Sequence, residues 1–258
     1  LGGSTYYTLL LIESLCSGKQ GYCVAEGLSR ITLFGRNEER LGLMADLCQQ
    51  LVNRVDKNIQ VDTSSRIEDC LQEQYGLLFN QIRFGGMNSR DQDEKIALRN
   101  DLAADETIGI VGVSNAIRAV QGMTEYLDVI KRKSNPYRLI NFTNPCSILT
   151  QYMREIYRLP AIGICDYPQM MKSKIAAALE CDIAQVDMGY VGLNHFGVVY
   201  SVLVDGEEQL NRLLSKEFDI QLPFKPECNR YFDTLLNVSW RYVFEHDDVV
   251  QEQQSKIN

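Results

Sequence analysis

Short apolar runs alternate with longer amphipathic segments along most of the chain. The run ITLF at residues 31–34 is followed by a turn, Gly35 to Asn37. After this turn the apolar residues recur at helical spacing, at Leu41, Met44, Leu47, Cys48 and Leu51. The pattern therefore predicts a strand at 31–34 and a helix directly after the turn, as in a βαβ unit.

The same alternation predicts more strands and helices downstream. The expected strands are 75–82 (YGLLFNQI), 137–143 (YRLINFT), 160–165 (PAIGIC) and 185–194 (QVDMGYVGLN). The expected helices include 147–157 (SILTQYMREIY) and 169–180 (QMMKSKIAAALE). Short apolar strands that alternate with amphipathic helices are typical of a mainly parallel sheet covered on both faces. We therefore expect an α/β fold with a doubly wound, mainly parallel sheet.

A pair of glycines stands at the start of the chain, where Gly2, Gly3 and Ser4 precede the apolar run that begins at Tyr6. Such a turn lets backbone N–H groups and a helix N-terminus approach a phosphate, although a glycine pair alone is more often only a turn. In such a fold, the strand after the glycine turn and its helix normally ends in an acid that binds a ribose. Here that strand is 31–34, and the residues after it are Gly35-Arg36-Asn37. Arg36 suits a 2′-phosphate, so NADP stays open beside NAD.

The periodic pattern changes after Val204, where a polar segment and an irregular region rich in aromatic residues follow. We expect a Rossmann-like nucleotide-binding domain at residues 1–200. Residues 201–258 then begin a second α+β domain that covers the substrate. Both ends of the sequence look interrupted, and we expect residues to be missing from each.

Composition narrows the classes of partner. The formal net charge is −8 and the pI about 4.9, which argues against a surface for nucleic acid or an anionic membrane. The longest apolar runs are shorter than the roughly 20 residues that span a bilayer, so we expect a cytoplasmic protein. Eight cysteines are scattered without a CxxC pair, which predicts buried thiols and neither a disulfide framework nor a structural zinc site.

Side chains suited to chemistry gather at the expected strand ends. Cys165 and His195 close successive strands, and together they offer a thiolate and an imidazole to a divalent transition metal. The alternative for each is structural: a buried thiol and a satisfied core histidine. Arg83 and Arg90 flank a Gly-Gly turn in a charged loop, where an arginine is the best candidate to bind a phosphorylated substrate in an acidic protein.

Six segments together resemble glycoside hydrolase family 4, the NAD- and metal-dependent glycosidases. They occur in the family's order between Gly2 and Val204: GGSTY, FNQIRFGGMNSRDQDEKIAL, DETIG, INFTNPCSI, GICDYP and GLNHFG. The sequence departs from the family at Leu1, where another glycine is usual, and at Gly35, where an acid is usual.

The resemblance implies a set of site residues. NAD would bind at the glycine turn and at the end of the strand 31–34. The residues concerned are Gly2, Gly3, Ser4, Thr5, Arg36 and Asn37. Cys165 and His195 would hold Mn²⁺ or a similar divalent metal. Asp166 would be the general acid, and Tyr242 is the candidate for the base. The implied substrate contacts are Arg90 for a sugar phosphate, Asn144 for a sugar hydroxyl, Glu106 and Asn194.

The resemblance also implies a mechanism of oxidation, elimination and addition. As the family is understood, the cofactor takes a hydride from C3 of the sugar, and the ketone acidifies the proton on C2. The base removes that proton, the metal stabilises the enediolate, and the aglycone leaves. Water then adds and the hydride returns. A Cys-Asp pair before proline, as in Cys165-Asp166, resembles the 6-phospho-α-glucosidases, whereas Cys-Asn resembles the 6-phospho-β-glucosidases.

We therefore expect a 6-phospho-α-glucosidase that acts on a phosphorylated disaccharide or glycoside, as a homodimer or homotetramer. Within the same family, a 6-phospho-β-glucosidase and an α-galactosidase or α-galacturonidase stay open. Outside it, two further hypotheses are an NAD(P)-dependent dehydrogenase and a nucleotide-binding sensor without catalysis.

Overall fold

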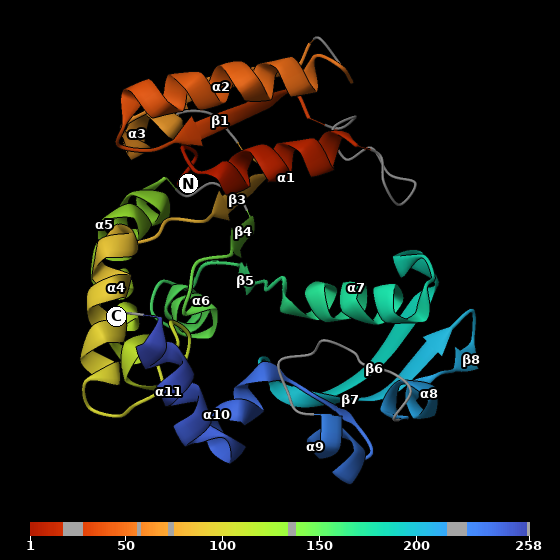
Figure 1. The fold of residues 1–258 in the computed structure, drawn as a ribbon. Coiled ribbons are helices and arrows are strands. Elements are labelled where there is room, and N and C mark those ends of the chain that lie inside the picture. Colours follow the sequence, from red (N-terminus) through yellow and green to blue (C-terminus); the bar gives the residue numbers. More distant parts are fainter. Residues whose placement is uncertain (18–27, 56–57, 72–74, 134–137, 216–225, 257–258) are drawn as a thin grey trace. The chain divides into compact units, whose positions relative to one another are not determined.

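The computed structural model describes residues 1–17, 28–55, 58–71, 75–133, 138–215 and 226–256 (Figure 1). The chain divides into two units, which are described separately. The first consists of Leu1–Asp93 and Asp105–Ile164, and the second of Glu94–Ala104 and Cys165–Asn258. Among the described residues, no helix is both long and apolar enough to cross a membrane.

The first unit contains five parallel strands in two groups. β1 (Arg30–Phe34) pairs with β2 (Gln60–Ser64), and β3 (Leu77–Asn80), β4 (Arg138–Asn141) and β5 (Ala161–Gly163) pair in chain order. The predicted strands at 31–34, 75–82, 137–143 and 160–165 are confirmed as β1, β3, β4 and β5, although Tyr137 lies outside the described residues. β2 is QVDTS, whose side chains are mostly polar and exposed, and no apolar run marks it.

Helices pack on these strands, while Leu77 of β3 and Ile162 of β5 are 50% and 55% exposed. The core over β1 and β2 is formed with α1 (Tyr6–Cys16) and α2 (Glu38–Val52). The core over β3, β4 and β5 is formed with α3 (Ile67–Cys70), α5 (Gly109–Arg132) and α6 (Cys146–Glu155). α5 forms because small and apolar residues recur along one side of it, and Ala119, Met123 and Leu127 are fully buried. α4 (Gly86–Leu98) crosses the division between the units at Asp93.

Residues 1–3 bond to both groups of strands. The N–H groups of Gly2 and Gly3 donate to Phe34 O at 2.9 and 2.7 Å, and Leu1 O accepts from Gln81 N at 3.1 Å. Gly2 has a φ of 82°, in the left-handed region that favours glycine. A Cβ atom at Gly3 would lie 2.7 Å from the Cβ of Leu33, so only glycine fits. The glycine pair is therefore required by the close approach of the backbone to β1.

The second unit is built around an antiparallel sheet. β6 (Val186–Leu193) pairs with β7 (Phe196–Val204), and β7 also pairs with β8 (Glu207–Glu208) and β9 (Leu235–Leu236). The other elements are α7 (Tyr167–Leu179), η2 (Ile183–Gln185), α8 (Leu210–Leu214), α9 (Pro226–Tyr231), η3 (Val238–Trp240), α10 (Arg241–Phe244) and α11 (His246–Ser255). The predicted strand at 185–194 is confirmed, but it belongs to this sheet and not to the parallel one, because a loop of two residues joins it to an antiparallel partner.

The division into units differs from the domains expected from the sequence. The expected boundary at residue 200 falls inside β7, whereas the first unit ends at Ile164. The periodic pattern continues unchanged through α7 and β6, so it carries no mark of the division. Of the cysteines expected to be buried, Cys48 and Cys70 are, and burial raises the pKa of Cys48 to about 11. Cys23 lies outside the described residues.

Two buried amides join the ends of β3 and β4. Asn80 and Asn141 are fully buried register partners, and Asn80 Nδ2 donates to Asn141 Oδ1 at 2.9 Å. Asn80 Nδ2 also donates to Thr143 Oγ1, and Asn141 Nδ2 donates to Cys146 O and Thr150 Oγ1, each at 3.2 Å. The pair therefore holds the loop that leaves β4 and the first turn of α6.

Replacement of Asn141 by Leu should destabilise the protein, because Asn80 loses a buried acceptor. We expect a loss of about 1–3 kcal/mol for each buried polar group left unpaired, measured by urea unfolding. The double variant Asn80→Leu/Asn141→Leu should lose less than the sum of the two single losses. Asn88→Ala, at an exposed position of α4, serves as the control and should change stability by less than about 0.5 kcal/mol. Unchanged stability in Asn141→Leu would contradict the assignment.

Candidate functional site

Cys165 and His195 lie together in the second unit. Cys165 stands between β5 and α7, and His195 is in the two-residue loop between β6 and β7. Their side chains meet, with 3.2 Å between Cys165 Sγ and His195 Nε2. Both residues are half-buried. The structure therefore brings together the two residues that the sequence pairs as metal ligands.

The surroundings of Cys165 favour its thiolate. Burial alone would raise the pKa of the thiol. The contact with His195, the backbone N–H of Tyr167 at 3.5 Å and the side chain of Asn194 outweigh burial and bring the pKa of Cys165 below its ordinary value. A thiolate is the form of cysteine that binds metals. The same contacts therefore prepare Cys165 as a ligand.

The geometry of the pair fits adjacent ligands of one ion. Cys165 Sγ and His195 Nε2 are 3.2 Å apart, close enough for both atoms to bind the same ion. A thiolate with an imidazole suits a divalent transition metal. Among the described residues, no three His, Cys, Asp or Glu side chains gather to hold a metal. An ion held by the pair alone would therefore keep open positions for oxygen atoms of a substrate.

Three other predicted residues belong to the same unit. Asp166 is the residue before α7, but its side chain makes no capping bond to the helix, and its Oδ1 lies 4.0 Å from Cys165 Sγ. Asn194 precedes His195 in the hairpin loop, and its side chain interacts with Cys165. Tyr242 is half-buried in α10, which follows η3 directly. Its role as a base stays a prediction.

The other predicted substrate residues meet in the first unit around Glu106. Arg90 Nη1 lies 3.3 Å from Glu106 Oε2, and Asn144 Nδ2 donates to Oε1 at 2.9 Å. Arg83 forms a two-pronged ion pair with the same carboxylate. Glu106 is 15% exposed, whereas Arg83 and Arg90 are 37% and 36% exposed. The cluster joins the loop after β3, helix α4 and the loop after β4.

Two guanidinium groups face the carboxylate of this cluster. Burial alone would raise the pKa of Glu106, but the bonds from Arg83 and Asn144 and the charges of Arg83 and Arg90 hold it below its ordinary value. Basic side chains therefore gather at this place in a chain of net charge −8.

Arg83, which the sequence analysis names with Arg90 as a candidate to bind a phosphorylated substrate, is part of the Glu106 cluster. A second residue of the cluster, Asn115, was not identified from the sequence. Asn115 is a buried residue of α5 whose Nδ2 donates to Glu106 O and Asn144 O, both at 3.2 Å. A polar residue within an otherwise apolar helix face was the only signal, and it does not identify a partner.

The residues predicted to bind NAD lie around the glycine turn. The N–H groups of Gly2 and Gly3 donate to Phe34 O. An anion at the turn would therefore be bound by N–H groups in the first turn of α1, which begins after Thr5. A Cβ atom at Gly35 would lie 3.4 Å from Ser4 Oγ, which shows that the glycine turn lies beside the end of β1. Arg36 is exposed, and Asn37 Oδ1 caps α2 by accepting from Arg40 N at 2.9 Å.

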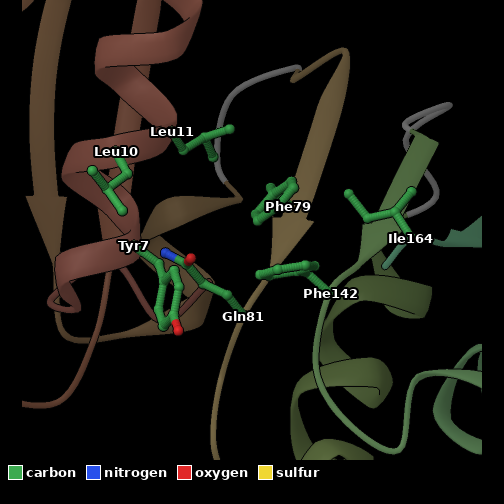
Figure 2. A pocket seen from close by; sticks show the side chains of 7 residues that line it. All are labelled: Tyr7, Leu10, Leu11, Phe79, Gln81, Phe142 and Ile164. Carbon is green, nitrogen blue, oxygen red and sulfur yellow. The ribbon is translucent and has the colours of Figure 1, made fainter. Parts of the chain in front are cut away.

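A cavity of about 250 Å³ opens in the first unit between α1 and the ends of β3, β4 and β5 (Figure 2). Its lining is Tyr7, Leu10, Leu11, Phe79, Gln81, Phe142 and Ile164. Gln81 Nε2 is occupied by Thr8 Oγ1 at 2.6 Å. The lining is apolar apart from this residue and includes none of the predicted site residues. It therefore offers little to a phosphate or a ribose.

Comparisons with known proteins agree on one family. The model of the family described as "Family 4 glycosyl hydrolase" matches residues 1–181. A 6-phospho-beta-glucosidase of Thermotoga maritima is 30% identical over 209 residues, which cover 81% of this chain and 48% of that protein. A phospho-alpha-glucosidase of Clostridium acetobutylicum is 25% identical over 249 residues, covering 95% and 54%. The chain therefore spans about half the length of the curated relatives it matches.

Solved structures agree with the fold class. The 6-phospho-beta-glucosidase from Thermotoga maritima, solved with manganese, NAD⁺ and glucose-6-phosphate, has a TM-score of 0.84 and 26% identity, covering 98% of this chain and 61% of that one. A lactate dehydrogenase from Eimeria maxima has a TM-score of 0.56 at 17% identity, covering 82% and 58%, and it shows the fold alone. The expected Rossmann-like α/β fold is confirmed.

The lowered pKa of Glu106 predicts a pH dependence of stability. The stabilisation that ionised Glu106 gives the folded protein is fully present above the pKa of an unfolded glutamate. It is lost as the pH falls through the lower pKa of Glu106 in the folded state. The free energy of unfolding of the parent, minus that of Glu106→Gln, should therefore be larger at pH 7 than at pH 3. Urea unfolding at both pH values measures it.

The same comparison in an Arg83→Met background tests the cause. Without that guanidinium the pKa of Glu106 is lowered less, so the change between the two pH values should be smaller. An equal change in both backgrounds would show that Arg83 does not hold the carboxylate in its ionised form.

Proposed function

Because the chain belongs to family 4 of the glycosyl hydrolases, we propose that it is part of a 6-phospho-α-glucosidase that uses NAD and Mn²⁺ or a similar divalent metal. The observation that carries this proposal is the convergence of Cys165 Sγ and His195 Nε2 at 3.2 Å, with the carboxylic acid of Asp166 next to the thiol. The Thermotoga maritima relative solved with manganese, NAD⁺ and glucose-6-phosphate supports the same cofactors.

The residues of the second unit have distinct roles in this proposal. Cys165 and His195 would hold the ion, and its open positions suit the hydroxyl oxygens of a sugar. When bound, NAD supplies a hydride acceptor and the ion a Lewis acid for an oxyanion. Asp166 is exposed and makes no capping bond, so its carboxyl group is available to carry the proton for the leaving oxygen. Tyr242 is proposed as the base.

The residues of the first unit favour a phosphorylated sugar. Arg90 brings a positive charge to an acidic protein, and a planar guanidinium matches the oxygens of a phosphate. Asn144 and Glu106 supply the amide and carboxylate groups that bind sugar hydroxyls. The turn from Gly2 to Thr5, with Arg36 and Asn37, is proposed to bind NAD, and NADP stays open.

A second candidate is a 6-phospho-β-glucosidase. It is favoured by the 30% identity to the Thermotoga maritima 6-phospho-beta-glucosidase, which exceeds the 25% identity to the Clostridium acetobutylicum phospho-alpha-glucosidase. The α-glucosidase is preferred because residue 166 is Asp, in a Cys-Asp pair that precedes Pro168 and helix α7. We propose a phosphorylated disaccharide or glycoside as substrate, a homodimer or homotetramer as the assembly, and the cytoplasm as the location.

The activity is tested with 4-nitrophenyl 6-phospho-α-glucoside and its β anomer. We expect release of nitrophenol from the α anomer only when NAD⁺ and Mn²⁺ are both present, measured after the protein has been stripped of cofactor and treated with chelator. Preference for the β anomer would establish the second candidate. Net accumulation of NADH would indicate a dehydrogenase, because the glycosidase cycle returns its hydride.

The acid is tested by leaving-group dependence. Asp166→Asn should lower turnover of a disaccharide phosphate by about 10²-fold or more, because a sugar leaves poorly without a proton. Turnover of the nitrophenyl substrate, whose leaving group needs no proton, should fall much less. Asp187→Asn, at an exposed position of β6, is the control and should leave both rates unchanged. Equal losses on both substrates would contradict the role of Asp166.

A further inference from the structure

Tyr167 touches both residues of the Cys165–His195 pair. It is the first residue of α7 and is 7% exposed. Its backbone N–H donates to Cys165 Sγ at 3.5 Å. Its ring packs on the ring of His195, with 5.0 Å between centroids and 35° between planes. Tyr167 therefore contacts Cys165 through its backbone and His195 through its side chain.

The hydroxyl group of Tyr167 extends this arrangement to η3. It accepts a hydrogen bond from Val238 N at 3.1 Å. The next residue, Ser239, donates its N–H to His195 O at 3.3 Å. The contacts therefore close a circuit that runs from Cys165 through Tyr167, Val238 and Ser239 to His195 and back to the thiol.

The circuit holds His195 in an uncommon conformation. His195 has a φ of 64°, in the left-handed region that residues other than glycine seldom adopt. Such a conformation persists where the surroundings determine it. The bond from Ser239 fixes the backbone of His195, and the ring of Tyr167 lies against its imidazole. Both contacts keep Nε2 directed at Cys165.

We propose that Tyr167 is the positioning residue of the metal pair, an inference that rests on the proposed metal site. Its ring orients the imidazole of His195, its hydroxyl anchors the segment that bonds the backbone of His195, and its N–H donates to the sulfur of Cys165. Groups that orient metal ligands from behind typically change metal affinity 10–100-fold when they are removed. Phenylalanine keeps the ring and the N–H but leaves Val238 N without its acceptor, whereas leucine also removes the ring.

Cobalt(II) provides a readout of the pair that is independent of activity, because a thiolate ligand adds a charge-transfer absorption band in the near ultraviolet. We would titrate the metal-free protein with Co²⁺ and record the band and the dissociation constant. Tyr167→Phe should weaken Co²⁺ binding by about 10-fold and Tyr167→Leu by about 100-fold, with a weaker or shifted band. Tyr200→Phe, at a 56% exposed tyrosine of β7, is the matched control and should bind as the parent does.

The outcomes separate the inference from the proposed function. Parent-like affinity and an unchanged band in Tyr167→Phe and Tyr167→Leu would overturn the role of Tyr167 and leave the metal site standing. No band in the parent, or a band that survives Cys165→Ala, would overturn the metal site and the inference with it. Far-ultraviolet circular dichroism and thermal melting of the metal-free variants show whether each is folded. If Tyr167→Leu unfolds, Tyr167→Phe decides the question.

Discussion

The hydrogen bond between the buried amides of Asn80 and Asn141 organises the chemistry of the first unit. The two residues end neighbouring parallel strands, and each lies three positions before a residue that binds Glu106, namely Arg83 and Asn144. Because the amides are fully buried, any slip of one strand against the other would leave them unpaired. The register of β3 and β4 therefore sets where the guanidinium and the amide meet the carboxylate.

The second unit aligns its two candidate metal ligands without strand pairing. Cys165 lies just before α7 and His195 lies in a hairpin loop, so no single sheet register aligns them. A closed circuit of contacts through Tyr167 and Ser239 links them instead. Burial would raise the pKa of Cys165, but the contacts with His195, Tyr167 and Asn194 bring it below its ordinary value. In both units, neighbouring residues outweigh the effect of burial on the pKa of an acidic group.

Much of this arrangement could be predicted from the sequence because its signals are local. Apolar runs marked β1, β3, β4 and β5, and helical spacing marked α2 and α6. The strand ends then pointed to Cys165, His195 and Asn144. β2 was missed because its side chains are polar, and the boundary between the units was placed too late because hydrophobic periodicity does not distinguish parallel from antiparallel strands. Asn115 and Tyr167 were missed because their partners are distant or are backbone atoms.

The sequence by itself determined the fold class, the family and the types of group available, since periodicity and motif order are properties of the chain. Only the tertiary structure decided which of these groups meet. It joined Arg83, Arg90 and Asn144 on one carboxylate and placed Asn194 beside Cys165. It also showed that the N–H groups of Gly2 and Gly3 donate hydrogen bonds to the carbonyl oxygen of Phe34. The physical reason is that hydrogen bonds and ion pairs act over a few ångströms in space, and strand pairing sets those distances between residues far apart in the chain.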